Sequence, residues 1–488
     1  MGTEVITGHG GEGARKASEA SAAPSRRREV KDHIRALIER GALRRGSRLP
    51  SILELSRTLE VAKNTVIGAL DELAGEGVLE ARERQGFFVK SERRRERARA
   101  TRLEDLASDR VAHGMATILV HDDDFLTIGC GTAAESLLAT PEWTAALKGA
   151  PPRDPRTSLR YADPKGEPLL REVIAARFGG AEEPGRRVIV CHGAVEGLNI
   201  AFAECAARTG SRRVAVESPG YFMLGPILQA LGLEVVAIPR TPEGLDVDAL
   251  RREARRAPLA ALMVNPNHQN PVGHTLSLAQ RFEVAKLAQD RDFWIIEDDV
   301  YRGLWIDEPE PPTIRSLLPD RTLYVGSFSK TLGPALRVGF IVAPDALVEA
   351  LLRRRFLGSL SGDSYTQRLV ADFVDRRGYQ RHLVEVREEL SRRARIAAHQ
   401  AATFPELGGF AGPYTGGLFW RFELAPGLDA MALYRAARAA NVLVSPGWFF
   451  RSDAEPGAAA DAWMRVNVSC CEGTTLTRAL EVLRAAAS

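Results

Sequence analysis

The sequence predicts an α/β protein with two folded units, a small helical unit at the N-terminus and a much larger body built on a mostly parallel sheet. The chain has 488 residues, more than one ordinary hydrophobic core accommodates. From residue 187 onward, short apolar runs alternate with helical patterns, which is typical of a parallel sheet covered on both faces. After Pro344 the pattern changes to long helices with a few strands, which predicts a smaller α+β lobe at the C-terminus.

The composition is that of a soluble globular protein, with 45% hydrophobic and 26% charged residues. A net charge of +3 is too small for the whole chain to bind nucleic acid, so any such surface must be local. The five cysteines form no CxxC pair, which favours a reducing cytoplasm and predicts no metal site. We interpret the adjacent Cys470 and Cys471 as core residues. No apolar run is long enough to span a bilayer, so no membrane partner is expected.

The N-terminal unit is predicted to be a winged helix-turn-helix over residues 28–91, after a disordered tail (1–27). Helical patterns cover residues 29–41, 48–61 and 63–77, and the last two are separated by a tight turn. Ser51 and Glu54 have the spacing of a capping box. Residues 78–90 are typical of a small hairpin, and the basic stretch that follows predicts a linker over 92–122.

The body is predicted to consist of a large domain over residues 123–344 and a small domain over 345–488. Seven apolar runs are the candidate strands of its main sheet: RVIVCH, RVAVES, EVVAIP, LAALMVN, FWIIED, TLYVGS and VGFIVA. The segments GGLFWRFEL and WMRVNVSC are candidate strands of the small domain.

The segment SFSKTLGPALRVGF holds a single lysine, Lys330, between hydroxyl side chains and a downstream arginine. A lysine amine becomes a nucleophile when its surroundings depress its pKa, and pyridoxal 5'-phosphate (PLP) is the commonest cofactor held in this way. The pyridine nitrogen of PLP needs a carboxylate, and Asp298 follows a predicted strand at the end where ligands of such sheets bind. Tyr301 and Asn270 are candidate donors to the phenolate oxygen of the ring.

The phosphate of PLP needs donors and positive charge, and several residues near Lys330 meet that need. Ser327, Ser329 and Arg337 flank the lysine in the sequence. The turn at Gly193, Ala194 and Val195 follows a predicted strand and offers backbone amides at a helix N-terminus. Tyr221 is a candidate ring to stack on the pyridine. Each motif alone also fits an ordinary turn or acidic loop, but their order on one parallel sheet makes coincidence improbable.

From about Leu159 to the end, the chain resembles the fold type I aminotransferases. LRYADPKGEPLLR is similar to the YxxPxGxxxLR motif of that family, NPNHQNPVG to its NPxNPTG motif, and SFSKTLGPALRVGF to its Schiff-base motif. The resemblance implies that Lys330 forms the internal aldimine with PLP and that Asp298 pairs with the pyridine nitrogen. By the same match, Asn270 and Tyr301 hold the phenolate, while Arg337 and Ser327 hold the phosphate.

Two further residues take a role only from this resemblance. Tyr161 would reach the phosphate bound by a neighbouring subunit, which implies a homodimer. Arg465 would clamp a ligand carboxylate in bidentate fashion, although an arginine lying across a strand end is a competing interpretation. The chain departs from the family at Ala194 and Val195, where a small hydroxyl and a glutamine are usual, so a side-chain contact to the phosphate is lost.

The N-terminal unit resembles a GntR-type winged helix, and a GntR head on an aminotransferase-like body is the layout of the MocR/GabR regulators. The resemblance implies that the head binds double-stranded DNA. Lys63, Asn64 and Thr65 begin the recognition helix, where base contacts are made. The residues expected at DNA phosphates are Arg48, Ser51, and Gln85 and Gly86 of the wing.

Three departures in the head weaken the expectation of DNA binding, and solvated polar residues of a domain with another use are the alternative. Leu53 stands where the family has an arginine, Ala62 where a hydroxyl usually caps the recognition helix, and Arg84 where the wing has its first glycine. The loss of the cap costs about 1 kcal/mol of helix stability.

Two functions therefore remain open from the sequence. The first is a PLP-binding transcriptional regulator that senses an amino acid or amine through aldimine exchange at Lys330. The second is a PLP-dependent enzyme, such as a transaminase, whose head is structural. The departures in the head favour the enzyme, as does DDVY (Asp298–Tyr301), which resembles working transaminases more than the DDYD common in GabR-like regulators. The pairing of the two units favours the regulator. The identity of the ligand does not follow from the sequence.

Overall fold

The protein is described by a computed structural model that covers residues 26–39, 43, 47–76, 78–82, 86–89, 125–149, 159–179, 185–241, 243–306, 309–452 and 462–487. The chain divides into two compact units at about residue 105, and each is described by itself. The predicted linker, most of the predicted tail, and Arg84 and Gln85 of the wing lie outside the described residues.

The head contains three helices and a two-stranded ribbon, as predicted. They are α1 (Arg26–Glu39), α2 (Ile52–Thr58), α3 (Lys63–Gly75), β1 (Leu79–Arg82) and β2 (Gly86–Val89). Apolar side chains from every element meet in one core, among them Val30 and Ile34 of α1 and Val66, Leu70 and Leu73 of α3. The segment before α2 also joins the ribbon, because the Leu49 amide donates to the carbonyl of Phe87 (2.9 Å).

The beginnings of α2 and α3 differ as the sequence predicts. The capping box of α2 is complete, since the Glu54 amide donates to Ser51 Oγ (3.2 Å) and the Ser51 amide donates to Glu54 Oε2 (2.7 Å). At the start of α3, Ala62 has the extended backbone of an N-cap residue but no side chain that accepts a hydrogen bond. The helix α3 therefore begins without a side-chain cap.

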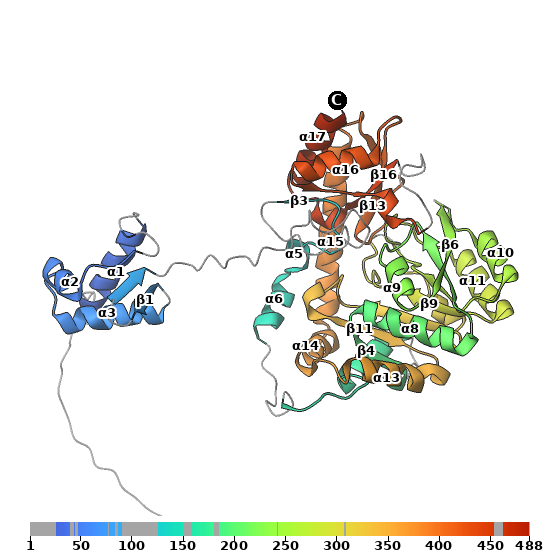
Figure 1. The fold of residues 1–488 in the computed structure, drawn as a ribbon, viewed down its shortest axis with the longest axis horizontal. Coiled ribbons are helices and arrows are strands. Elements are labelled where there is room, and N and C mark those ends of the chain that lie inside the picture. Colours follow the sequence, from blue (N-terminus) through green and yellow to red (C-terminus); the bar gives the residue numbers. More distant parts are fainter. Residues whose placement is uncertain are drawn as a thin grey trace, which may run out of the picture. The chain divides into compact units, whose positions relative to one another are not determined.

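The body is built on an eight-stranded sheet with the strand order β4-β11-β10-β9-β8-β5-β6-β7 (Figure 1). Its strands are β4 (Val188–His192), β5 (Arg213–Ser218), β6 (Glu234–Thr241), β7 (Gly244–Leu245), β8 (Ala261–Val264), β9 (Trp294–Asp298), β10 (Thr322–Ser327) and β11 (Val338–Val342). Only β11 and the short β7 run against the other strands. The predicted mostly parallel sheet is confirmed, and each of the seven predicted runs contains a strand.

Helices cover both faces of this sheet. Successive side chains of a strand point to opposite faces, so one strand contributes to the cores on both sides. Val214 and Val216 of β5 pack with α8 (Ala194–Thr209), α9 (Leu224–Ala230) and α13 (Asp345–Ser359). Ala215, between them, packs on the other face with α10 (Val247–Arg256), α11 (Leu278–Arg291) and α12 (Ile314–Leu317).

A third core lies at the β4 end of the sheet, where further helices cover the side chains of β4, β10 and β11. These helices are α5 (Glu135–Leu138), α6 (Pro141–Lys148), α7 (Pro168–Ile174), α14 (Ser364–Asp375) and α15 (Gly378–Ala401). Tyr324 of β10 and Phe340 of β11 belong to this core. The long helix α15 also packs against the C-terminal part of the body (Figure 1).

The C-terminal part has its own antiparallel sheet, with the order β12-β13-β16-β15. Its strands are β12 (Gly408–Phe410), β13 (Phe419–Leu424), β15 (Ser445–Pro446) and β16 (Trp463–Asn467), and it packs with α16 (Ala430–Ala439) and α17 (Thr475–Ala487). The short strands β3 (Leu126–Thr127) and β14 (Val442–Leu443) pair in parallel. This pairing brings the first described segment of the body beside the C-terminal lobe (Figure 1).

No helix in the described part of the chain combines the length and the hydropathy of a membrane span.

Candidate functional site

A cavity of about 500 Å³ opens at the carboxyl ends of the central strands of the body. Its walls come from the segments that follow β4, β5, β8, β9 and β10. The predicted site residues that line it are Ala194, Val195, Tyr221, Asn270, Asp298, Tyr301, Ser327, Ser329, Lys330 and Arg337. Such a crevice at the carboxyl ends of parallel strands is the general ligand position in α/β sheets.

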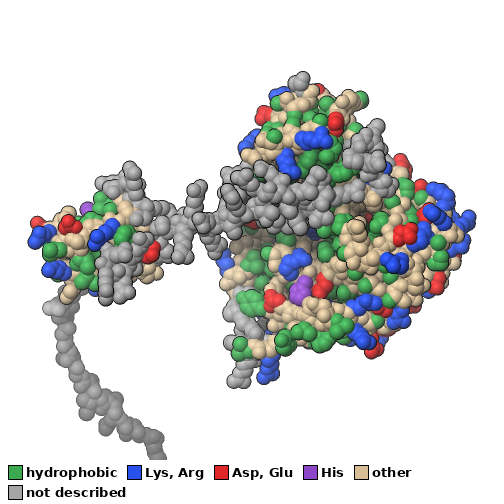
Figure 2. Space-filling view, viewed as in Figure 1, with side chains coloured by type: hydrophobic (Ala, Val, Ile, Leu, Met, Phe, Trp, Pro, Cys, Tyr) green, Lys and Arg blue, Asp and Glu red, His purple; other side chains and the backbone are tan. Residues whose placement is uncertain are grey.

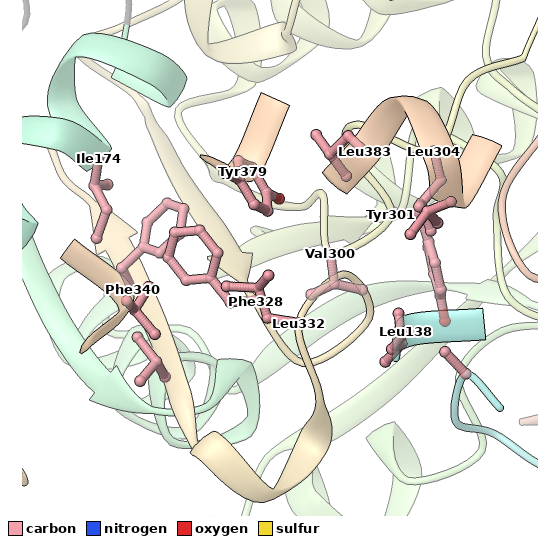
Figure 3. Close-up of a cluster of buried hydrophobic side chains, with 14 of the residues drawn as sticks. Leu138, Ile174, Val300, Tyr301, Leu304, Phe328, Leu332, Phe340, Tyr379 and Leu383 are labelled. Carbon is pink, nitrogen blue, oxygen red and sulfur yellow. The ribbon is translucent and has the colours of Figure 1, made fainter. Parts of the chain in front are cut away.

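The loop that carries Lys330 is held in place by the third core. Phe328 and Leu332, on either side of the lysine, are buried among Tyr301, Phe340 and Tyr379 (Figure 3). The Tyr379 hydroxyl donates to Thr331 Oγ1 (2.9 Å). The lysine backbone is thereby fixed by its neighbours, so its side chain is directed from a rigid support into the cavity.

The Lys330 side chain is partly buried, and its Nζ donates to the carbonyl oxygen of Gly131 (2.7 Å). Burial, followed by the positive charge of Arg465, lowers the pKa of Lys330 to about 8. A substantial fraction of the amine is therefore neutral near physiological pH, which is the form that attacks an aldehyde.

Asp298 lies at the end of β9 and faces the same cavity. Burial and the neighbouring Asp299 carboxylate raise the pKa of Asp298 to about 7, and Lys330 opposes that shift. The Oδ1 atom of Asp298 has no hydrogen-bond partner among the described residues. A buried carboxylate oxygen without a partner is costly, so this oxygen is suited to a cationic donor on a bound ligand.

Asn270 connects the cavity to the buried Arg465. Arg465 Nη1 donates to Asn270 Oδ1 (2.8 Å), and its Nη2 donates to the carbonyl of Gly129 (2.6 Å). The guanidinium lies 4.4 Å from the ring centroid of Phe419 and 4.7 Å from that of Phe450. Burial lowers the pKa of Arg465 to about 10, which leaves it positive at neutral pH.

Tyr301 and Tyr221 present phenol groups to the cavity. Burial, followed by the negative charge of Asp298, raises the pKa of both phenols, that of Tyr221 to about 12. Both are therefore neutral at physiological pH, and each is able to donate a hydrogen bond.

One end of the cavity has the features of an anion site. The first turn of α8 begins at Gly193, whose positive φ of 80° brings the backbone close to Arg337. A Cβ at Gly193 would lie 2.3 Å from Arg337 Nη2, so the close approach requires glycine. Ser327 Oγ donates to Ser329 Oγ (2.9 Å) at the same end. The helix amides, two hydroxyls and a guanidinium converge there.

Three predicted residues, Gly193, Tyr161 and Arg465, are not part of the cavity lining, and Gly193 lies at its edge as the N-cap of α8. Tyr161 is 85% exposed, and Arg465 lies behind Asn270. Conversely, Gly131, Thr132, Glu217 and Asn265 line the cavity and were not predicted as site residues; other such lining residues are Phe222, Leu224, Met263, Val300, Pro334 and Ala335.

Glu217 and Asn265 hold the backbone of Asp298 and Asn270 in place through a chain of hydrogen bonds. The buried Glu217 carboxylate pairs with the buried Arg240 (2.5 Å) and accepts from the Asn265 amide (2.8 Å). Asn265 Nδ2 in turn donates to the carbonyl of Asp298 (2.5 Å), and Asn265 Oδ1 accepts from the Asn270 amide (2.9 Å). A sequence signal existed for both residues, since each is a polar residue at the end of an apolar run.

The predicted DNA-contacting residues lie on the surface of the head. Lys63 and Asn64 are exposed at the start of α3, and Thr65 is half-buried. Arg48 and Gly86 are exposed beside each other, because the Arg48 side chain passes within 3.7 Å of the position of a Gly86 Cβ. In the view of Figure 2, blue and red side chains are interleaved over the head and over the body.

The geometry of the cavity fits PLP. Lys330 offers an amine for the aldehyde, the unpaired Asp298 oxygen offers a partner for a pyridinium N–H, and the anion site offers donors for the phosphate. Among the described residues, no group of His, Cys, Asp and Glu side chains is arranged to hold a metal ion.

Comparison with known proteins assigns both units to families. Residues 131–483 match the model of the aminotransferase class I and II family, and residues 26–89 match that of the gntR family of bacterial regulatory proteins.

Two relatives span both units. The HTH-type pyridoxine biosynthesis transcriptional regulator PdxR of Corynebacterium glutamicum is 29% identical over 434 residues, which cover 88% of this chain and 90% of that regulator. The uncharacterized HTH-type transcriptional regulator YjiR of Escherichia coli is 30% identical over 426 residues, which cover 85% of this chain and 89% of the relative.

Among solved structures, the body is similar to LysN, the α-aminoadipate aminotransferase of Thermus thermophilus, in complex with N-(5'-phosphopyridoxyl)-L-leucine. The TM-score is 0.66 at 27% identity, and the match covers 76% of this chain and 95% of LysN.

Proposed function

The chain belongs to the aminotransferase class I and II family, and we propose that it is a transcriptional regulator whose body binds PLP at Lys330 and senses an amino acid or an amine. A GntR head on such a body is the layout of the MocR/GabR-type regulators. The observation that carries the proposal is the presence, in one chain, of a winged head and a cavity lined by both Lys330 and Asp298, whose Oδ1 has no partner among the described residues.

In this proposal, each wall of the cavity holds a different part of the cofactor. Lys330 holds the aldehyde carbon, Asp298 accepts from the pyridine nitrogen, and Asn270 and Tyr301 donate to the phenolate oxygen. The phosphate is held by the first amides of α8, by Ser327 and Ser329, and by Arg337. Tyr221 lies against the ring. When bound, PLP supplies an aldehyde that condenses with amines and a ring that withdraws electrons from the bound amine.

The ligand is proposed to be an amine that takes the place of the Lys330 amine. With the cofactor and ligand bound, the Nζ of Lys330 would be the base for the proton on the Cα of that ligand. Arg465 is the candidate partner of a ligand carboxylate, because it is cationic and its Nε has no partner among the described residues. The two aromatic rings within 5 Å of the guanidinium exclude water and strengthen such a contact.

A homodimer is part of the same proposal. Tyr161 is exposed and lies outside the cavity of its own chain, which is the placement expected of a residue that completes the site of a second copy.

The head is proposed to bind double-stranded DNA, with Lys63, Asn64 and Thr65 at base edges. Arg48, Ser51 and Gly86 would then lie at phosphates on the flanks of the recognition helix. The hydroxyl of Ser51 accepts the cap hydrogen bond of α2, which holds Ser51 at the exposed start of that helix.

A second candidate function is a PLP-dependent transaminase with a structural head. The similarity of the body to an aminotransferase supports it, as does the missing cap of the recognition helix at Ala62.

A gel-shift titration of the full-length chain with the DNA upstream of its own gene separates the two functions. The regulator is expected to bind that DNA in preference to a scrambled sequence, and to bind more weakly as salt rises. The same preparation, mixed with amino acids and a keto acid acceptor, is expected to give no more than one turnover. Absence of specific binding together with multiple turnovers would support the transaminase instead.

A further inference from the structure

Two cysteine side chains face each other beside the cavity, although 340 positions separate them in the sequence. Cys130 follows β3, and Cys470 ends the short helix η7 (Val468–Cys470) after β16. Their sulfur atoms are 3.2 Å apart, within hydrogen-bond distance. Cys130 is buried, Cys470 is partly exposed, and no role in the proposed function involves either residue.

The backbone around the pair is held firmly, so the two thiols are positioned rather than merely close. Asn467 Nδ2 donates to Cys130 Sγ (3.1 Å), to the carbonyl of Cys130 (3.1 Å) and to that of Thr132 (2.6 Å). The Ala134 amide donates to Ser469 Oγ (3.0 Å). Together these bonds fasten the strap, defined as residues 129–134, to the end of β16.

The two sulfurs need little movement to become bonded. A disulfide S–S bond is about 2.0 Å long, so the observed separation must shorten by about 1.2 Å. Rotation of the two side chains supplies movement of this size without displacement of the fastened backbone. The hydrogen bond with Cys470, the contact with Thr132 and the positive charge of Arg465 lower the pKa of the Cys130 thiol, which favours its reactive thiolate form.

We propose that Cys130 and Cys470 form a reversible disulfide when the protein is oxidised by hydrogen peroxide. The Cys130 sulfur attacks one peroxide oxygen, the O–O bond breaks, and the departing hydroxide leaves as water after taking a proton. Cys470 then attacks the sulfenic sulfur of Cys130, and the hydroxyl leaves as a second water with the Cys470 proton. Two thiols and one peroxide become one disulfide and two waters, so the thiols lose the two electrons that the peroxide gains.

The disulfide would tether the strap covalently to the end of β16. The strap carries two carbonyl groups that bond to cationic site residues, since Gly131 accepts from Lys330 and Gly129 accepts from Arg465. The redox-active pair is therefore adjacent to the ligand site, but its formation requires no bound cofactor and does not depend on the proposed function.

Thiol counting on the full-length protein tests the proposal, with Cys471→Ser as a matched control. Cys471 is the sequence neighbour of Cys470, but it is fully buried and its Sγ donates to the carbonyl of Asn467 (3.6 Å). After mild peroxide treatment and denaturation, the wild-type chain is expected to lose two of its five free thiols and to regain them with dithiothreitol. The Cys471→Ser chain should also lose two, whereas Cys130→Ser and Cys470→Ser should form no intrachain disulfide.

Peptide mapping of the oxidised wild-type chain keeps the test decisive if a variant fails to fold. A cross-linked pair of peptides containing Cys130 and Cys470 supports the proposal. Five remaining thiols, a bond that involves Cys471, or a dimer band on a non-reducing gel would overturn it.

Discussion

The ion pairs that join α1 to α3 in the head and the charged residues around the cavity of the body lie in opposite environments. In the head, Lys31 pairs with Glu72 (3.0 Å) and Glu76 (2.6 Å), and the carboxylates of these pairs are about two-fifths exposed. In the body, the Glu217–Arg240 pair is buried, as are Asp298 and Arg465, and Lys330 is partly buried.

The difference has a physical consequence for what each unit can recognise. Exposed ion pairs in general contribute between zero and about 1 kcal/mol to stability and are screened by salt. The charged side chains of the head are therefore able to leave their partners and pair with a charged surface such as DNA. Buried charges have fixed geometry and shifted pKa values, which suits them to one small ligand in one orientation. Substitutions in the body are expected to have larger effects than substitutions in the head.

The largest effect is expected for Lys330→Ala. Because the substitution removes the amine that holds the aldehyde of PLP, covalent attachment should be lost completely. The absorbance spectrum of the purified protein should lose its yellow band. Lys286→Ala, at an exposed lysine of α11, should retain the full band and serves as the control. A yellow Lys330→Ala protein that still carries covalent PLP would refute the site assignment.

Asp298→Asn is expected to have the next largest effect. The amide keeps the shape of the side chain but cannot pair with a pyridinium, and a hydrogen bond to a charged group contributes about 1.5–3 kcal/mol. PLP affinity, measured by equilibrium dialysis, should fall on the order of 10- to 100-fold. Asp292→Asn, at an aspartate that is 85% exposed, should leave the affinity unchanged. Equal affinities for the two variants would argue against a buried pyridinium partner.

The pH dependence of PLP attachment tests the lowered pKa of Lys330 directly. The neutral amine is the nucleophile, and a folded pKa of about 8 lies below the ordinary value of 10.5. The neutral fraction, and with it the attachment rate of the cofactor-free protein, should rise about tenfold from pH 7 to pH 9 and then level off. Stopped-flow absorbance measures this rate. A rate that keeps rising through pH 10 would indicate an unperturbed lysine.

In the head, Ala62→Ser should stabilise the recognition helix, because a serine hydroxyl accepts a hydrogen bond from the uncapped first turn of α3. The expected gain is about 1 kcal/mol, which corresponds to roughly fivefold slower hydrogen exchange of the α3 amides. Ala62→Val, which adds bulk but no acceptor, is the control. Exchange slowed equally by both variants would mean that packing, and not capping, is the cause.

The smallest effect is expected for Leu53→Arg. Leu53 is 43% exposed at the start of α2, so a longer side chain is accommodated without loss of packing. An added phosphate contact should strengthen DNA binding by up to about fivefold. It should also steepen the dependence of log affinity on log salt by about one. Leu53→Gln provides a neutral control. An arginine variant that behaves like the glutamine variant would place this surface away from the DNA.

The sequence predicts the body better than it predicts the full site, for a physical reason. Apolar runs identify the strands, and parallel strands bring their carboxyl ends to one edge, so Asp298 and Lys330 meet as expected. The strap is different, because it reaches the cavity through the pairing of β3 with β14, and Gly131 lies 199 positions from the lysine that it contacts. No local pattern in the sequence records such a contact.

The cysteines illustrate the same limit. Cys471 is fully buried, as its interpretation as a core residue requires, but Cys470 is partly exposed and faces Cys130. Adjacent residues in an irregular segment point in different directions. The partner of Cys470 comes from the opposite end of the sequence of the body. In the head, by contrast, the capping box and the missing cap at Ala62 are local features, and both follow from the sequence alone.

The central claim is that the amine of Lys330 holds the cofactor. Borohydride reduction of the PLP-loaded protein, followed by trypsin digestion and mass spectrometry, tests it most directly. Trypsin does not cleave at a modified lysine, so the account predicts one labelled peptide that runs from Thr322 to Arg337 with the added mass on Lys330. A label on any other lysine, or no label on a yellow protein, would contradict it.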